Sequence, residues 1–358
     1  MKVGILTYHR SHNYGALLQA IALRKVLADM GHEVTFIDYW PDYHKHMYEV
    51  IPIQSIIFYE ETIRNKLRWF KSCIRNIKYR KNRIQEFESF ISIYILPYTS
   101  TKEETYDLII HGSDQIWRKQ PELRWYNPIY FGKHGIISKR KISYAASMGI
   151  LCNTEEEINE VSELLSCLNS ISVRESDLKS MIENMGYKCY QHVDPTLLLR
   201  GEDWISIMKL QKSLHKKYIL FYDLLPNSFD LNLIKDYARN NNMQLITIYA
   251  SAEKKNTDCD ITTGGPLKFL ELVYNASFVF TSSFHGLVFA ILFKKEFYAS
   301  FSTNSCRGAS LLKMLGLSER LLAPMSMIPT TYQTIDFQRV DNMLEDLKIN
   351  SLDYLKQI

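Results

Sequence analysis

Short apolar runs alternate with segments of helical periodicity over most of the chain. Residues 2–7 predict a strand, residues 15–30 predict an amphipathic helix that Gly31 ends, and residues 33–38 predict the next strand. This alternation is typical of parallel sheets covered by helices. The opening resembles the first half of a Rossmann-like unit. It lacks the GxGxxG turn, however, so it does not indicate a bound dinucleotide.

Further strands are expected in two groups, with helices between most of them. Those of the first group are residues 108–111, 141–145, 170–173 and 189–193, and those of the second are 218–222, 244–249, 277–281 and 296–299. The sequence therefore predicts an α/β chain with a domain boundary near residue 205. We expect an N-terminal Rossmann-like domain over 1–205, a C-terminal Rossmann-like domain over 206–330, and a helical segment over 331–358 that packs back on the body.

Composition supports two folded domains. The chain has 358 residues, 46% hydrophobic and 13% aromatic, which is enough for a core in each domain. The six cysteines are scattered, without a CxxC pair or a metal-ligand spacing, and indicate reduced thiols in a cytoplasmic protein. The N-terminus lacks the features of a signal peptide, and apolar stretches such as 51–59 are too short to cross a bilayer. No cofactor and no fixed metal are expected.

The net charge of +4 is too small to indicate a nucleic-acid partner, but positive charge is concentrated in a helical insertion at about 55–95. Residues 62–85 contain no acidic residue. They carry nine cations: Arg64, Lys66, Arg68, Lys71, Arg75, Lys78, Arg80, Lys81 and Arg83. Two interpretations stay open for this segment. It is either a solvated helix face, or a helix that rests on anionic lipid headgroups or attracts a phosphorylated acceptor.

The clearest candidate for chemistry lies in residues 278–293, which read as an apolar strand, a polar turn and an apolar helix. His285 is expected at that turn, where the carboxyl end of a strand meets the amino end of a helix. Ligands and anions collect at such positions in α/β sheets. A histidine at a turn is by itself more often structural, and the location is what favours a catalytic role.

Six short motifs occur in one order along the chain: Asn13-Tyr-Gly-Ala-Leu-Leu-Gln-Ala20, Gly112-Ser-Asp-Gln-Ile-Trp117, Ser143-Tyr-Ala-Ala-Ser-Met-Gly149, Ser172-Val-Arg-Glu175, Val193-Asp-Pro-Thr196 and Ser283-Phe-His-Gly286. Each motif alone is weak. The ordered set resembles the polysaccharide pyruvyltransferase family, from the first strand to about residue 320. Arg307 and the run over 311–317 also fit.

The resemblance implies a glycosyltransferase-B-like pair of Rossmann-like domains with a cleft between them. It also implies phosphoenolpyruvate as donor and a pyruvate ketal on a glycan as product. Carried over by position, His285 is the general acid and base and Arg174 binds the donor's carboxylate or phosphate, which suits an imidazole and a guanidinium. Ser282 and Ser283 are further donor ligands. Ser283 stands where some members have arginine, and either Arg307 or a residue of the amino-terminal loop is expected to compensate for that cation.

The acceptor sugar is expected at two other motifs. Asn13 and Tyr14 are candidates to face it, although Asn13 also fits a simple helix N-cap. Asp114 is a candidate second base, with Gln115 and Trp117 as sugar-binding partners, or else it caps a turn. Asp194, before Pro195, is expected to be structural.

Three functions remain open from the sequence. The leading one is formation of a cyclic pyruvate ketal on a hexose of a capsule, exopolysaccharide or cell-wall precursor. Its acceptor would be carried on a membrane lipid diphosphate, and the enzyme would contact the inner face of the membrane. The second is a nucleotide-sugar-dependent glycosyltransferase of the same architecture, which lacks support from any Glu-rich ribose-binding stretch. The third is a non-catalytic protein that binds glycans or lipid surfaces.

Overall fold

The chain folds into two compact units. The computed structural model describes residues 1–58, 62–100, 104–120, 125–213, 217–225, 227–249, 259–260, 264–301, 306–329, 331 and 333–357. The first unit comprises Met1–Leu198 and Lys348–Ile358, and the second comprises Leu199–Leu347. The division falls a few residues before the position expected from the sequence. The C-terminal helix α13 (Phe337–Lys356) begins in the second unit, and its last turns belong to the first.

The first unit is built on a parallel sheet with the strand order β3-β2-β1-β4-β5. The strands are β1 (Lys2–Leu6), β2 (Glu33–Ile37), β3 (Thr99–Ser100), β4 (Tyr106–His111) and β5 (Ser138–Ser143). A separate parallel pair, β6 (Ile171–Val173) and β7 (Cys189–Gln191), is linked to β5 by a bridge between Ile142 and Ser170. The central strands are almost wholly apolar and buried, as expected for a parallel sheet with both faces covered.

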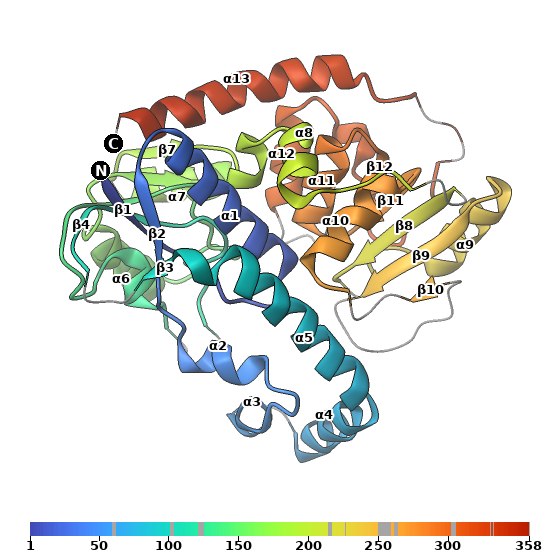
Figure 1. Ribbon diagram of the computed structural model, residues 1–358, viewed down its shortest axis with the longest axis horizontal. Helices are drawn as coiled ribbons and strands as arrows, with labels where there is room; N and C mark the ends of the chain where they lie inside the picture. Colours follow the sequence, from blue (N-terminus) through green and yellow to red (C-terminus); the bar gives the residue numbers. More distant parts are fainter. Residues whose placement is uncertain are drawn as a thin grey trace. The chain divides into compact units, whose positions relative to one another are not determined.

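Helices of the first unit fall into two sets (Figure 1). One set connects sheet strands: α1 (Tyr14–Asp29), α6 (Glu155–Leu165), α7 (Ser176–Asn184), and the short 3₁₀ helices η2 (Pro128–Phe131) and η3 (Pro195–Leu198). The other set lies between β2 and β3 and forms the predicted insertion: α2 (Asp42–Met47), α3 (Ile53–Phe58), α4 (Ile63–Arg75), α5 (Ile77–Tyr94) and η1 (Leu96–Tyr98). Most of α1 is buried, which explains its apolar composition.

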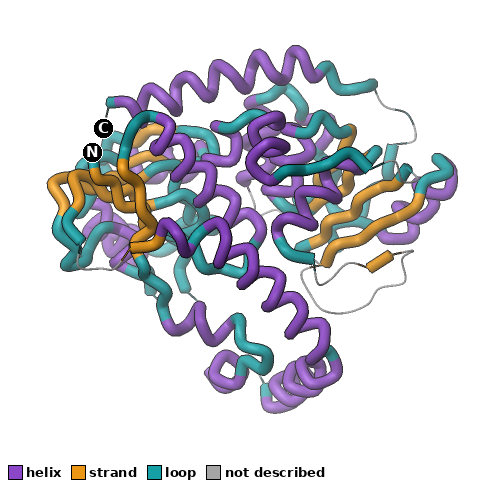
Figure 2. The backbone as a smooth tube through the Cα atoms, viewed as in Figure 1, coloured by secondary structure: helices purple, strands orange, loops and turns teal. Residues whose placement is uncertain are grey.

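The second unit repeats the same plan, with the parallel order β10-β9-β8-β11-β12 (Figure 2). Its strands are β8 (Tyr218–Asp223), β9 (Gln244–Tyr249), β10 (Cys259–Asp260), β11 (Phe278–Thr281) and β12 (Glu296–Ala299). Its helices are α8 (Gly201–Met208), α9 (Leu231–Asn240), α10 (Pro266–Asn275), α11 (Phe284–Leu292), α12 (Cys306–Met314) and η4 (Ser318–Arg320). The predicted α/β class with two Rossmann-like units is confirmed, whereas the arrangement of the units and a cleft between them stay predictions.

The end of α13 belongs to the core of the first unit. The Tyr354 hydroxyl donates to the Ser143 carbonyl at 3.1 Å and lies 3.0 Å from the Ser170 hydroxyl. The Val193 amide donates to the Ser351 hydroxyl at 3.2 Å. Hydrogen bonds therefore join the last turns of this helix to β5 and to the segment after β7.

The topology creates one special position in each sheet. The chain runs from β1 to β2 on one side and returns to β4 on the other, and it does the same around β8 with β9 and β11. At such a switch point the connections leave neighbouring strands in opposite directions, and ligands bind beyond the carboxyl ends of those strands. The candidate sites are therefore the ends of β1 and β4 in one unit, and of β8 and β11 in the other. Among the described helices, none is long and apolar enough to cross a bilayer.

Four buried or half-buried histidines of the first unit have lowered pKa values. Burial lowers the pKa of His44, His134 and His192 to about 4, and of His111 well below the ordinary value. Both ring nitrogens of His111 lack a hydrogen-bond partner among the described residues. A buried imidazole of this kind stays neutral in the folded chain.

We expect the free energy of unfolding to fall as the pH decreases from about 6.5 to about 4. An unfolded chain binds protons at these histidines below about pH 6.5, whereas the folded chain does not until a much lower pH, so acid favours unfolding. His111→Leu should remove one such site and flatten the decline by up to about 1.4 kcal/mol per pH unit. Urea unfolding at several pH values measures this. His46→Leu on α2 is the control, and an equal flattening in both variants would contradict the assignment to His111.

Candidate functional site

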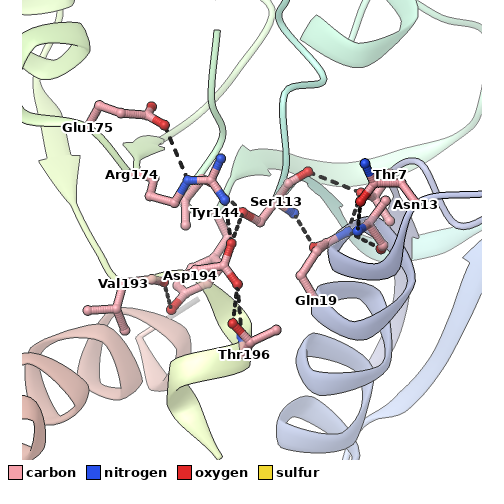
Figure 3. Close-up of polar contacts among 12 residues, drawn as sticks. Thr7, Asn13, Gln19, Ser113, Tyr144, Arg174, Glu175, Val193, Asp194 and Thr196 are labelled. Atoms are coloured by element: carbon pink, nitrogen blue, oxygen red, sulfur yellow. Dashed lines mark hydrogen bonds and ion pairs between the residues drawn. The ribbon is translucent and has the colours of Figure 1, made fainter. Parts of the chain in front are cut away.

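The switch point of the first unit is held together by a hydrogen-bonded ring of Thr7, Gln19 and Ser113 (Figure 3). The Gln19 carboxamide donates to the Thr7 hydroxyl at 3.0 Å and accepts from the Ser113 amide at 3.1 Å. The Thr7 hydroxyl donates to the Ser113 carbonyl at 3.1 Å. The ring ties together the ends of β1 and β4 and the first turns of α1. Gln19 of the first motif and Ser113 of the second are thus explained by one contact.

Behind this ring lies a buried ion pair between Arg174 and Asp194 (Figure 3). The Arg174 side chain also pairs with the Glu175 carboxylate, at 3.2 Å from its Nε. The second oxygen of Asp194 accepts from the amide and hydroxyl of Thr196 at 3.0 and 2.6 Å. The Ser113 hydroxyl lies 3.5 Å from Asp194 and donates to the Ala145 carbonyl at 2.7 Å.

Five of the six sequence motifs therefore meet in one buried polar network. Its charges favour the protonated guanidinium: burial lowers the pKa of Arg174, but the carboxylates of Glu175, Asp194 and Asp114 outweigh that effect and raise it. The positive charge is compensated inside the protein. These contacts give Arg174 a structural role in the first unit, and its assignment as a donor ligand stays a prediction. The structural role expected for Asp194 agrees with these contacts.

Asp114 projects from the same network. Gly112 has φ of +124°, and a Cβ there would lie 2.4 Å from the Tyr144 carbonyl oxygen, so the approach of the chain to Asp114 requires glycine. Asp114 itself has φ of +70°, a left-handed conformation that costs about 1–2 kcal/mol in a residue other than glycine. Its carboxylate makes no hydrogen bond or ion pair within the described ranges.

The side chains around Asp114 include aromatic and imidazole groups that sequence reasoning missed. Burial raises the pKa of Tyr8 and Tyr48, and Asp114 adds to both shifts. Burial lowers the pKa of His44 to about 4, against the opposing charge of Asp114. The rings of Tyr8 and His44 lie 4.5 Å apart, and the Gln120 amide donates to the Tyr8 hydroxyl at 3.0 Å.

A signal for two of these residues was present in the sequence. Tyr8 follows β1 almost directly, and His44 lies on the short helix that follows β2. Carboxyl ends of neighbouring parallel strands meet at one edge of a sheet, so polar residues just after each strand are candidates for one site. The positions of Tyr8 and His44 in the sequence therefore indicated site residues outside the six motifs.

Of the two acceptor candidates on α1, only Asn13 is exposed. Its side-chain oxygen accepts from the Ala16 amide at 3.2 Å, which makes it the N-cap of the helix. Tyr14 is buried, stacks on Phe87 at 5.3 Å and receives a hydrogen bond from Arg83 at 3.4 Å. Tyr14 is thus a core residue that holds α5 against α1, and its assignment to the acceptor stays a prediction.

The two acceptor candidates after Asp114 are packed within the first unit. Trp117 is fully buried, stacks on Phe131 at 5.0 Å and donates its indole N–H to the Tyr130 carbonyl at 3.0 Å. No part of the Trp117 ring is exposed, and its assignment to the acceptor stays a prediction. Gln115 is half-buried, with its carboxamide packed against Gly149.

In the second unit, His285 lies at the switch point on the first turn of α11. The Ser283 hydroxyl caps this helix by accepting from the Gly286 amide at 3.3 Å. A Cβ at Gly286 would lie 2.3 Å from the Thr281 hydroxyl and 2.9 Å from the Tyr222 ring, so only glycine lets α11 begin this close to β8 and β11. His285 is therefore held beside the positive end of a helix dipole, where an anion is favoured.

Two further candidates for binding the donor lie near His285, namely Ser282 and Arg307. The Ser282 hydroxyl donates to Asp223 at 3.0 Å and accepts from the amides of Leu224 and Leu225 at 2.7 and 3.2 Å, so its hydrogen-bonding capacity is used within the loop after β8. Its assignment as a donor ligand stays a prediction. Arg307, on α12, lies 5.9 Å from the centre of the Phe284 ring, next to His285 in the chain.

The described residues contain no group of three His, Cys, Asp or Glu side chains that could hold an ion. Charge at the two switch points is carried by arginine, histidine and carboxylate side chains.

Comparison with known structures gives distant likenesses. UDP-GlcNAc 2-epimerase from Methanocaldococcus jannaschii is 12% identical with a TM-score of 0.48, over 96% of this chain and 92% of that one. The E. coli heptosyltransferase WaaC with ADP is 10% identical with a TM-score of 0.43, over 97% and 100%. With TM-scores below 0.5, neither likeness supports a conclusion about function. No curated protein sequence matches the chain.

A family model, by contrast, matches most of the chain. The model described as Polysaccharide pyruvyl transferase covers residues 13–305, which include all six motifs, Asp114 and the His285 turn. Membership indicates a transferase that acts on polysaccharide. The chain belongs to the polysaccharide pyruvyl transferase family.

Proposed function

We propose that this chain transfers the pyruvyl group of phosphoenolpyruvate to two hydroxyls of one sugar in a surface-polysaccharide precursor, forming a pyruvate ketal. The observation that carries the proposal is the position of His285, at the switch point and on the first turn of α11, within the matched family region. An acid and base is needed there, beside a site that favours anions.

The reaction requires one proton to be delivered and two to be removed. His285 gives a proton to the methylene carbon of phosphoenolpyruvate, which becomes a methyl group, and the adjacent carbon then accepts the oxygen of the first hydroxyl. The second hydroxyl oxygen attacks the same carbon as the bond to phosphate breaks. One hydroxyl proton returns to His285. The other is removed by Asp114 and passes to the departing phosphate, which leaves as inorganic phosphate. Donor and diol thus yield ketal and phosphate without any cofactor.

We assign the donor to the second unit, where three groups suit an anion. These are the amino end of α11, the hydroxyl proton of Ser283 and the guanidinium of Arg307. Ser283 accepts a hydrogen bond through its oxygen, and its own O–H has no acceptor among the described residues. Arg307 would supply the cation that Ser283 lacks, since a guanidinium binds carboxylate and phosphate through paired hydrogen bonds.

The acceptor is assigned to the first unit, with Asp114 as the base for a sugar hydroxyl. Asp114 lies on a glycine-dependent turn, and its charge acts on the Tyr8 and His44 side chains nearby. Asn13 is the exposed partner on α1. The acceptor class we propose is a capsule, exopolysaccharide or cell-wall precursor carried on a membrane lipid, modified in the cytoplasm.

We expect His285→Gln to abolish transfer while it leaves the donor bound. Loss of the proton donor should lower kcat by about 100- to 10,000-fold, with donor affinity changed by only a few-fold. Arg307→Gln should weaken phosphoenolpyruvate binding by about 10- to 100-fold, because one charge-assisted contact is lost. Calorimetric titration with phosphoenolpyruvate, and phosphate release with a glycan acceptor, measure both.

Two controls accompany these variants. Lys313→Gln, an exposed cation on the same helix as Arg307, should leave donor affinity unchanged. A panel of nucleotide sugars is titrated in parallel. Binding of a nucleotide sugar with no binding of phosphoenolpyruvate would contradict the proposal and favour a glycosyltransferase, and full function in His285→Gln would favour a glycan-binding protein.

For Arg174 we expect a loss of stability rather than a specific loss of donor binding. Arg174→Met leaves Asp194 and Glu175 buried without their cation, which costs about 3–5 kcal/mol in free energy of unfolding. The double variant Arg174→Met/Asp194→Leu should recover part of that loss. Urea unfolding gives the stabilities. A folded, stable Arg174→Met protein that has lost phosphoenolpyruvate affinity would restore Arg174 as a donor ligand.

A further inference from the structure

One helix of the insertion carries an apolar stripe that is exposed among the described residues. On α4, Ile63, Leu67, Phe70 and Ile74 follow at intervals of four, three and four residues, which places them on one side of the helix. Their side chains are 78%, 54%, 37% and 49% exposed. Single exposed apolar residues are common on protein surfaces, whereas an aligned series is typical of an interaction surface.

A cationic stripe runs beside the apolar one. Arg64, Arg68, Lys71 and Arg75 repeat the same spacing one residue later, which is about 100° further around the helix. All four are exposed, and no ion pair to them is found in the parts of the chain that the structure describes. α4 therefore presents two parallel stripes, one apolar and one positive, with no acidic residue between Thr62 and Gln85.

The remaining side of α4 fixes the helix to the first unit. Cys73 is buried, Trp69 is half-buried, and α4 contacts α3 and α5. The following helix is held by Arg80, which donates to the carbonyls of Val50 at 2.7 Å and Glu49 at 3.0 Å. Figure 1 shows α4 at the end of α5 that is away from the β1 to β4 sheet. The two stripes are thus presented by an anchored element.

We propose that α4 lies in the interface of an anionic phospholipid bilayer, with the apolar stripe among the acyl chains and the cationic stripe at the headgroups. A helix that is rich in charged residues, with its apolar and basic side chains on separate sides, is the type that binds membranes in this orientation. A second copy of the chain fits poorly, since pairing the apolar stripes would bring two cationic stripes together. An anionic surface complements both stripes at once.

Membrane binding by α4 would set the location of the protein in the cell, which goes beyond the proposed chemistry. Membrane binding by α4 needs neither phosphoenolpyruvate nor a glycan, so it can be measured separately from transfer. If the acceptor is lipid-linked, as proposed, α4 would hold the enzyme at the surface that carries it.

The test is co-sedimentation of the full chain with vesicles. We expect binding to phosphatidylcholine vesicles that contain phosphatidylglycerol, little binding to pure phosphatidylcholine, and weakening with added salt. Arg64→Gln/Arg68→Gln/Lys71→Gln should weaken binding by about 100-fold, at about fivefold per cation. Ile63→Ser/Ile74→Ser should weaken it by at least about tenfold through lost apolar burial.

Matched variants control for general charge and hydrophobicity. Lys188→Gln/Lys217→Gln/Lys313→Gln removes three exposed cations elsewhere, and Ile137→Ser/Ile349→Ser removes two isoleucines of 69% and 50% exposure. Both controls should bind like the original chain, and circular dichroism checks that every variant is folded. Absence of binding to anionic vesicles, or equal losses in the controls, would overturn the proposal. So would a dimer in sedimentation velocity that Ile63→Ser/Ile74→Ser dissociates while vesicle binding is absent.

Discussion

The first unit depends on one buried charge, the guanidinium of Arg174. A cation without water is tolerated only if carboxylates and hydrogen bonds replace its hydration. Asp194 and Glu175 do so, and Asp194 is in turn fixed by Thr196. Because Ser113 connects this pair to the ring of Thr7 and Gln19, the charge pair supports the turn from which Asp114 projects. The same contacts stabilise the fold and position the carboxylate that we propose as a base.

Much of the fold could be predicted because parallel strands buried on both faces are continuous apolar runs. The strands around Ile109, Ile219 and Val279 are of this kind, and their positions differ from the prediction by only a few residues at most. The two-residue strands β3 and β10 were missed, since their pairing depends on neighbours and not on their own composition. The turn that places His285 could also be predicted, because an apolar strand and an apolar helix flank it.

Side-chain direction was the part that the sequence could not give. Trp117 and Tyr14 are aromatic residues within polar motifs, which suggested a sugar site, yet both rings fill the core. Ser282 and Arg174 have suitable chemistry for an anion, but their hydrogen bonds are directed to other parts of the protein. His44 and Tyr8 meet near Asp114 only through the pairing of strands far apart in the sequence. Short motifs therefore identified where the site lies better than which side chains serve it.

The last turns of α13 have a consequence for biosynthesis. Ser351 and Tyr354 complete hydrogen bonds to Val193, Ser143 and Ser170, so the first unit contains the first and the last residues of the chain, with the second unit inserted between them. A ribosome makes the second unit in one continuous stretch. Most of the first unit is synthesised earlier, but its core is complete only when the last turns of α13 have been made. A premature stop after the second unit would therefore damage the unit that was made first.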